Sequence, residues 1–290
     1  MGATLLERAP AKINLTLRVI GRRADGYHEL ESLVVFADLA DKLELQPAAK
    51  DRLEIIGPFA GKSGPAAENL VLKASTALRD RVGHLKGGLF LLEKNVPVAA
   101  GLGGGSADAA AALRLVARAN GLALDDDRLI SAARAVGADV PVCLDPRPRV
   151  MRGVGDVLSR PLELPPLPAV LVNPGVLLAT RDVFANMTIE QKERPSGDVP
   201  HEFDALVEFL KRDDNDLTSA ASACAPAVAD VLLALQGLPA VKLARMSGSG
   251  ATCFALFGTS AEATAAAQRV GERKSWWVHT TTLGRGAAVS

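Results

Sequence analysis

The sequence predicts an α+β fold divided into two domains. Strand-like and helix-like segments are mixed along the chain, without the strict alternation that a doubly wound sheet requires. The chain has 290 residues, a length that suits one large domain or two small ones. A cluster of prolines at residues 161–172 is the best candidate for a boundary. We therefore expect an N-terminal domain over residues 1–160 and a C-terminal domain over residues 161–290.

The first part of the chain has the pattern of β-strands. Apolar residues alternate with polar residues from Ile13 to Val19, and a period of two is typical of a strand. The dipeptide Asp25-Gly26 indicates a turn, and residues 30–46 contain two further strand-like runs. We therefore expect several strands before the first helix.

Helical patterns dominate the chain from there to residue 136. Apolar residues at helical spacing predict helices at 66–82, 107–120 and 127–136, with a strand at 89–98. Asp125, Asp126 and Asp127 supply an N-cap and favourable first-turn charges for the last of these helices. Gly121 and Gly137 follow the ends of the second and third helices, where glycine is a common terminator.

The second half has the same mixed character. We expect strands at 169–173, 251–257 and 276–283, and helices near 202–212, 226–236 and 260–272. No internal repeat accompanies them. Strands and helices in this irregular order favour α+β packing over a repeat protein or a doubly wound sheet.

Charge and composition exclude several classes of protein. The 33 basic and 33 acidic side chains cancel, which argues against a nucleic-acid-binding protein or a polybasic membrane-surface protein. No apolar stretch approaches the roughly 18 residues of a transmembrane helix, and the N-terminus lacks the pattern of a secretory signal. The three widely spaced cysteines suit a reducing compartment. We expect a cytoplasmic protein; the composition does not indicate its oligomeric state.

Residues 57–64, GPFAGKSG, are similar at first sight to the P-loop of nucleotide-binding proteins. A P-loop places four residues between its first glycine and the Gly-Lys-Ser/Thr sequence, whereas only three follow Gly57. Gly64 and Pro65 also interrupt any helix directly after the loop. The spacing therefore predicts an ordinary surface loop.

The glycine-rich residues 97–107 are a stronger candidate for a phosphate-binding loop. Four glycines lie between Gly101 and Gly105, directly between a predicted strand and a predicted helix. Glycine allows the backbone to approach an anion closely, and the positive end of a helix dipole favours negative charge. Ser106 adds a hydroxyl that can cap the helix or reach a phosphate or its metal ion. We therefore expect an anion site at this loop.

The loop does not match the dinucleotide fingerprint of Rossmann domains. That fingerprint requires an acidic residue at the end of a following strand, about twenty residues on. The acidic residues 125–127 lie instead at the predicted start of a helix. A nicotinamide or flavin cofactor is therefore not expected.

Several blocks of the sequence resemble a known family. Residues 97–107 resemble the phosphate-binding motif of the GHMP kinases, the superfamily of galactokinase, homoserine kinase and mevalonate kinase. Residues 246–252, MSGSGAT, resemble the third, C-terminal glycine motif of that superfamily. The blocks APAKINL at 9–15, RADGYH at 23–28 and GADVP at 137–141 resemble the branch that phosphorylates a cytidine-diphosphate-linked methylerythritol. The blocks occur in the family's order over nearly the whole chain.

The resemblance implies an ATP-dependent kinase of the non-mevalonate isoprenoid pathway, with Mg²⁺ bridging the phosphates. It implies a two-domain GHMP-kinase-like architecture with the active site between an ATP-binding N-terminal domain and a substrate-binding C-terminal domain. A sister kinase that acts on homoserine, mevalonate or a sugar is the alternative enzyme. A non-catalytic nucleotide-binding module is the alternative from a different class. The sequence shows no carboxylate cage, so protein ligands of the metal are not assigned.

The same resemblance assigns Lys12 and Asp139 as the catalytic pair. A carboxylate can accept the proton of the attacking hydroxyl, and an ammonium group can orient that hydroxyl and offset developing charge. Without the family, Asp139 could simply end a helix after Gly137, and Lys12 could be a solvated lysine of a strand. Whether Asp139 acts as a base or as a charge-stabilising group stays open at this level.

The resemblance also assigns the binding residues. Those expected at ATP are Asn69, Lys94, Pro97, Val98, Ala99, Ala100, Gly101, Leu102, Gly103, Gly104, Gly105, Ser106 and Ala107. Those expected at the cytidine substrate are Asn14, Tyr27, His28, Thr180, Phe184, Gly248 and Gly250. Structural roles are the alternatives: a helix cap for Asn69, a strand end for Lys94, core packing for Phe184, a surface hairpin for Tyr27 and His28, and a hairpin turn for the last two glycines.

Overall fold

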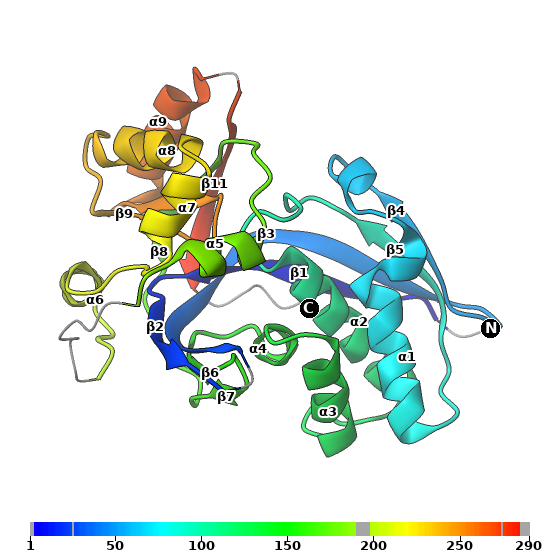
Figure 1. Cartoon of the computed structure of the whole chain (residues 1–290). Coiled ribbons are helices and arrows are strands. Elements are labelled where there is room, and N and C mark those ends of the chain that lie inside the picture. The colour runs from blue at the N-terminus through cyan, green and yellow to red at the C-terminus, as the bar shows by residue number, and fades with distance from the viewer. Residues whose placement is uncertain (1–2, 25, 190–197, 274, 285–290) are drawn as a thin grey trace.

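The computed structural model describes residues 3–24, 26–189, 198–273 and 275–284 (Figure 1). Asp25 of the predicted turn therefore lies outside the described residues, while Gly26 has a left-handed φ of 88°. The described strands form one mixed sheet whose main order is β4-β5-β3-β11-β8-β10-β9. β1 and β2 pair with β3, and β6 pairs with both β3 and β7.

The strands are short except for β1 and β3. They are β1 (Leu5–Asn14), β2 (Arg18–Arg22), β3 (His28–Pro47), β4 (Arg52–Ile56), β5 (Gly88–Glu93), β6 (Arg149–Gly153), β7 (Val157–Leu158), β8 (Leu167–Asn173), β9 (Leu243–Met246), β10 (Cys253–Leu256) and β11 (Trp277–Gly284). The central strand β3 pairs antiparallel with β1, β2, β5, β6 and β11. It therefore joins the strands of both halves into one sheet.

The helices gather in two groups. They are α1 (Leu70–Val82), α2 (Gly104–Asn120), α3 (Asp127–Val136), α4 (Val140–Leu144), α5 (Thr180–Asn186), α6 (Phe203–Lys211), α7 (Thr218–Cys224), α8 (Ala227–Gln236) and α9 (Ser260–Gly271). In Figure 1, α1, α2 and α3 lie beside the N-terminal strands, whereas α8 and α9 lie against the C-terminal strands. None of the helices in the described ranges is long and apolar enough to cross a bilayer.

The mixed α+β content that we predicted is confirmed, and the long helices lie close to their predicted positions. The helix predicted at 66–82 begins later, because residues 66–68 form a 3₁₀ turn and Asn69 caps α1 by accepting from the backbone N–H of Val71. The strand predicted at 89–98 ends early at Glu93. The carboxylate of Asp41 accepts from the backbone N–H groups that follow, which turns the chain out of the sheet.

The periodicity predicted one strand over the alternating residues 13–19, and this prediction is wrong. β1 ends at Asn14, and the chain crosses to the C-terminal half at Leu17 before β2 begins. There the backbone N–H of Leu17 donates to Asp214 and its carbonyl accepts from Asp216, at 3.0 and 2.9 Å. Conversely, the two runs predicted within residues 30–46 form the single strand β3. Alternation alone cannot distinguish a continuous strand from one that changes partners.

Apolar residues of both halves meet in the core. One cluster lies between the N-terminal sheet and α1–α3, and another lies under α7–α9. A third cluster includes Ile13 and Val35 from the N-terminal half together with Leu171 and Phe254 from the C-terminal half. The two halves therefore share a core as well as a sheet.

Candidate active site

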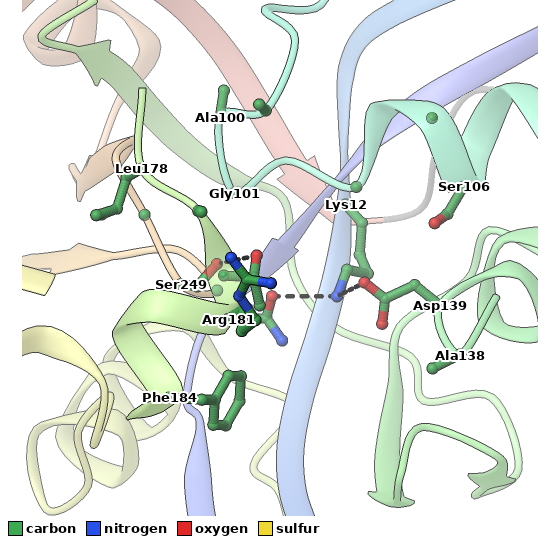
Figure 2. Close-up of a pocket in the computed structure, with 18 of the residues that line it drawn as sticks. Lys12, Ala100, Gly101, Ser106, Ala138, Asp139, Leu178, Arg181, Phe184 and Ser249 are labelled. Carbon is green, nitrogen blue, oxygen red and sulfur yellow. Dashed lines mark hydrogen bonds and ion pairs between the residues drawn. The ribbon is translucent and has the colours of Figure 1, made fainter. Parts of the chain in front are cut away.

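A cavity of about 1200 Å³ lies where α2, α4, α5, β1 and the C-terminal glycine motif meet. Its walls come from both halves of the chain. Figure 2 shows Lys12 and Asp139 on one side, Arg181 and Ser249 on the other, and Gly101 beside them. Most of the residues that the sequence pointed to line this cavity.

The glycine-rich loop forms one wall of this cavity. Gly103 is the N-cap of α2 with a φ of 59°, so the helix begins directly at the loop. A Cβ on Gly103 would lie only 3.1 Å from the Cβ of Lys12. The loop is also tied to β1, because the backbone N–H of Lys12 donates to the carbonyl of Leu102 at 2.8 Å. The first backbone N–H groups of α2 can therefore meet an anion close to Lys12.

Two of the residues predicted at ATP do not line the cavity. Leu102 and Ala107 are buried, and their side chains belong to hydrophobic clusters on either side of the loop. Their place is explained by the need to anchor a glycine-rich segment that has few side chains of its own. Ser106 lines the cavity as the third residue of α2, so it does not cap the helix.

Lys12 and Asp139 meet although they lie far apart in the sequence. The Nζ of Lys12 is 3.0 Å from the Oδ2 of Asp139 and 3.2 Å from the Oδ1 of Asn14. Lys12 is almost fully buried on β1, whereas the side chain of Asp139 is 35% exposed at the start of α4. Asn14 is itself held by a 2.7 Å hydrogen bond that its Nδ2 donates to Ser32. The ammonium group therefore has a fixed position, and the carboxylate faces the cavity.

Lys94 lies in the same cavity but is engaged by two acids. Its Nζ forms ion pairs with Asp41 and, at 2.8 Å, with Asp108 of α2. Burial alone would lower the pKa of Lys94, but the two carboxylates outweigh burial and raise it. Burial and the neighbouring Asp41 raise the pKa of Asp108 well above its usual value. The positive charge of Lys94 is therefore already balanced by carboxylates within the protein, which leaves little of that charge to stabilise a phosphate.

Aromatic residues gather at the opposite end of the cavity. The ring of His28 stacks on Phe184 of α5, with centroids 4.8 Å apart and an interplanar angle of 24°. Tyr27 also lines the cavity, and 67% of its surface is exposed. Desolvation and the nearby charge of Arg22 lower the pKa of His28, which favours a neutral imidazole. A flat base could be held by stacking and by a neutral hydrogen-bonding edge at this end.

The C-terminal glycine motif packs directly against the glycine-rich loop. The Oγ of Ser247 donates to the carbonyl of Gly101 at 3.0 Å, and a Cβ on Gly101 would lie 2.5 Å from the carbonyl oxygen of Ser247. Gly248 and Gly250 both line the cavity with left-handed φ angles. The two motifs thus form adjacent backbone walls, which a hairpin turn alone would not explain.

Two residues of this wall were missed by the sequence reasoning. Ser249 shares a 2.8 Å hydrogen bond with Thr180, which ties the C-terminal motif to the start of α5. Arg181 follows Thr180, lines the cavity and has a side chain that is 93% exposed. The motif itself could have indicated Ser249. Arg181 carried no signal, because α5 is too short to show a helical pattern.

The comparisons with known proteins agree on one family. The family model described as GHMP kinases N terminal domain matches residues 69–145, and the model for GHMP kinases C terminal matches residues 200–275. A 4-diphosphocytidyl-2-C-methyl-D-erythritol kinase of Rhodopseudomonas palustris (strain BisB5) is 53% identical, and the match covers 96% of this chain and 99% of the relative. The chain belongs to the 4-diphosphocytidyl-2-C-methyl-D-erythritol kinase family.

Other members of the family are similarly close. The enzyme of the same name from Xanthobacter autotrophicus (strain ATCC BAA-1158 / Py2) is 53% identical, with 95% of this chain and 98% of that enzyme covered. A crystal structure of 4-(cytidine 5'-diphospho)-2C-methyl-D-erythritol kinase is 36% identical, with a TM-score of 0.78 and coverage of 97% and 100%. The resemblance of the sequence blocks to this branch of the GHMP kinases is thus confirmed.

A sister kinase shares the fold alone. Homoserine kinase from Cytophaga hutchinsonii has a TM-score of 0.72 but only 19% identity, with coverage of 100% of this chain and 98% of that one. The two-domain GHMP-kinase architecture that we predicted is therefore confirmed. The residue boundary at 160/161 stays a prediction, and β8 begins within the proline cluster at Leu167.

Proposed function

We propose that this protein transfers the γ-phosphoryl group of ATP to the 2-hydroxyl of 4-diphosphocytidyl-2-C-methyl-D-erythritol. The observation that carries the proposal is the Lys12–Asp139 pair, at 3.0 Å, beside the glycine-rich loop in a cavity that ends in stacked aromatic rings. Family membership supports the same reaction, since the relatives carry that enzyme's name. The substrate is accordingly a small molecule.

The phosphates of ATP would bind at the glycine-rich loop. Membership in a GHMP kinase family implies ATP as the phosphoryl donor. The N-terminus of α2 directs backbone N–H groups and the positive end of its dipole into the cavity. This backbone-based arrangement suits a chain with no net charge, because phosphate binding does not require a broad basic surface. The base of ATP would extend toward Asn69, which lines the same cavity.

Lys12 and Asp139 would act on the attacking hydroxyl. Asp139 can accept a hydrogen bond from that hydroxyl and then its proton, while the fixed ammonium group of Lys12 stabilises the developing charge. Phosphoryl transfer depends mainly on positioning and electrostatic stabilisation, which a buried lysine on β1 provides. The hydroxyl would bind on the cavity side of the pair, where Asp139 is exposed.

The cytidine end of the substrate would lie against the aromatic residues. The rings of His28 and Phe184 stack on each other, and 67% of the surface of Tyr27 is exposed. From there the diphosphate would pass along Arg181 and Ser249 toward Lys12 (Figure 2), beside Thr180, which also lines the cavity. A guanidinium fork matches the oxygens of a diphosphate well. We propose Arg181 as a contact that the family resemblance did not assign.

Magnesium would be held mostly by the phosphates themselves. Within the described ranges, no three acidic, histidine or cysteine side chains gather closely enough to form a metal site. The Ser106 hydroxyl and the exposed carboxylate of Asp139 are among the oxygens that line the cavity near the loop, and such sparse oxygen ligands fit an ion that keeps water and phosphate ligands. When bound, Mg²⁺ would neutralise phosphate charge.

A cytoplasmic location stays a prediction from the sequence.

The experiment that tests the proposal measures ADP release with four acceptors. The purified protein is given ATP, Mg²⁺ and either 4-diphosphocytidyl-2-C-methyl-D-erythritol, homoserine, mevalonate or galactose. We expect turnover with the first acceptor alone, because the other three lack a cytosine for the aromatic end of the cavity. Turnover of another acceptor without turnover of the first would overturn the proposal.

A further inference from the structure

We propose that Asn215 is a positioning residue that aims a backbone N–H of the C-terminal glycine motif at the substrate diphosphate. Asn215 is 2% exposed and does not line the cavity, so it cannot touch a substrate itself. Its effect would pass through the loop formed by residues 246–250. This inference rests on the proposed function, because it assumes that a cytidine diphosphate group occupies the cavity.

The side chain of Asn215 holds this loop from behind. Its Nδ2 donates to the carbonyl oxygens of Met246 and Gly248, each at 2.8 Å. Its Oδ1 accepts from the backbone N–H of Leu217 at 3.0 Å. Two donated bonds and one accepted bond fix the orientation of the amide. Among side chains of this size, only asparagine offers two donors and a carbonyl acceptor together.

The orientation of one carbonyl determines the direction of the next N–H. The peptide bond between Gly248 and Ser249 is trans, so its C=O and N–H groups point in opposite directions. The Gly248 carbonyl points to the buried Asn215, so the backbone N–H of Ser249 points away from Asn215; because Ser249 lines the cavity, we infer that this N–H faces the cavity. No acceptor in the described part of the chain takes a hydrogen bond from that N–H. It is thus a donor available to a ligand.

The surroundings of Ser249 suggest which ligand this donor meets. The Oγ of Ser249 bonds to Thr180 at the start of α5, the helix that also carries Arg181 and Phe184. Figure 2 shows Ser249 and Arg181 close together on the wall that faces Lys12. The N–H therefore lies between the aromatic end of the cavity and the catalytic pair, where the diphosphate of the acceptor would pass.

The support for Asn215 is itself rigid. The neighbouring Asp214 and Asp216 bond to both sides of Leu17, and the carboxylate of Asp216 accepts from Val19 at 2.9 Å. Leu17 lies between β1, which carries Lys12, and β2. The segment thus joins the strand of the catalytic lysine to the C-terminal motif. It sets the distance between the ammonium group and the Ser249 N–H.

The test compares the binding of cytidine and cytidine diphosphate to the full chain by calorimetry. Asn215→Asp keeps the shape of the side chain but replaces the donor Nδ2 with an oxygen that faces the carbonyl oxygens of Met246 and Gly248. Repulsion between these oxygens would displace or rotate the loop formed by residues 246–250. We expect the variant to lose at least about tenfold in affinity for cytidine diphosphate, equivalent to about 1.4 kcal/mol, with little change for cytidine. A general loss of folding would weaken both ligands together.

A matched variant controls for the replacement of a buried amide by a carboxylate. Asn173 is also buried, and its Nδ2 donates to the hydroxyl of Thr252 at 2.9 Å. In Asn173→Asp that hydroxyl can rotate and donate to the new carboxylate, so we expect nearly unchanged binding of cytidine diphosphate. If Asn215→Asp does not fold, Asn215→Ala replaces it, because alanine removes both donors without adding a charge.

The outcomes separate this inference from the proposed function. If the Asn215 variants bind cytidine diphosphate within about threefold of the wild type, the positioning role is wrong. The same holds if the wild type binds cytidine and cytidine diphosphate equally, because no donor then meets the phosphates. Failure of the proposed function would appear separately, as absent turnover of the cytidine substrate in the ADP assay.

Discussion

Asp139 combines exposure with a close cation, and this combination makes it the residue most directly tied to chemistry. We expect Asp139→Asn to lower kcat at least about a hundredfold, because the amide cannot accept the hydroxyl proton, with only a modest change in the KM for ATP. Single-turnover phosphoryl transfer measures this step without product release. Asp127→Asn, an exposed change in the first turn of α3, is the control and should keep full activity. Transfer at a near wild-type rate in Asp139→Asn would contradict the assignment.

Asp108 is the second of two buried carboxyl groups that contact the single ammonium group of Lys94. The single ammonium group of Lys94 faces two buried carboxyl groups, and within the described residues the Oδ1 of Asp108 has no hydrogen-bond partner. We expect Asp108→Asn to raise the free energy of unfolding at pH 7 by about 1 kcal/mol, since the amide leaves a balanced Lys94–Asp41 pair.

The pH dependence gives the sign of this effect. The folded protein holds the proton of Asp108 more tightly than the unfolded chain, where the pKa is 3.8, because burial raises its pKa in the folded state. Its contribution to stability is therefore present below about pH 3.8 and is lost as the pH rises toward the raised pKa. The gain from Asp108→Asn should grow over that range, as urea unfolding at several pH values would show. A gain that is largest at low pH would contradict this account.

At the scale of elements, the two glycine motifs depend on each other's backbone. Gly101 has a φ of 76°, and a Cβ there would lie 2.5 Å from the Ser247 carbonyl and 2.6 Å from that of Gly250. We expect Gly101→Ala to separate the motifs, lower kcat/KM and reduce the free energy of unfolding. Gly121→Ala is the matched control, because Gly121 also has a left-handed φ, at 67°, but nothing within 4 Å of its Cβ position.

Both alanine variants should lose about 1–2 kcal/mol through the left-handed backbone. Gly101→Ala should lose about 1–3 kcal/mol more through the collision, and it alone should lose activity. Urea unfolding and steady-state kinetics of the two variants give the comparison. Equal stabilities in the two variants would show that the motifs do not constrain each other.

The elements that sequence reasoning missed are mostly short. α4, α5 and α7 have five to seven residues, and β9 has four, so none repeats a pattern often enough to be seen. α5 and α4 nevertheless carry much of the site, since one begins at Thr180 and the other directly follows Asp139. The long helices were predictable because their apolar faces recur over several turns, as in α2 and α3.

At the scale of the whole molecule, the shared sheet and core should make the two halves unfold together. β3 pairs with β11, and the shared cluster contains side chains from both halves. Both tryptophans, Trp276 and Trp277, lie in the C-terminal half, and the ring of Trp277 also packs against Phe59 of the N-terminal half, with centroids 6.3 Å apart. We expect tryptophan fluorescence and far-ultraviolet circular dichroism to give the same urea midpoint. Two separated midpoints would show that the halves are independent.

The local features of this protein follow from its sequence. The glycine-rich loop, the long helices and the α+β class follow from residues close together in the chain, and the spacing of residues 57–64 was enough to exclude a P-loop there. Lys12 and Asp139 could be named from their motifs because each motif is a short continuous block. Such features depend on backbone conformation and periodicity, which neighbouring residues control.

The way in which these features combine depends on tertiary contacts. The tertiary structure brought Lys12 to Asp139, engaged Lys94 with two acids, and placed Arg181 and Ser249 opposite Lys12 and Asp139. It also showed that the chain leaves the sheet at Leu17 to meet Asn215. These contacts join residues from distant parts of the chain, and their energies depend on burial and partner geometry. No local pattern contains that information, because the same residue types serve equally well on a solvated surface.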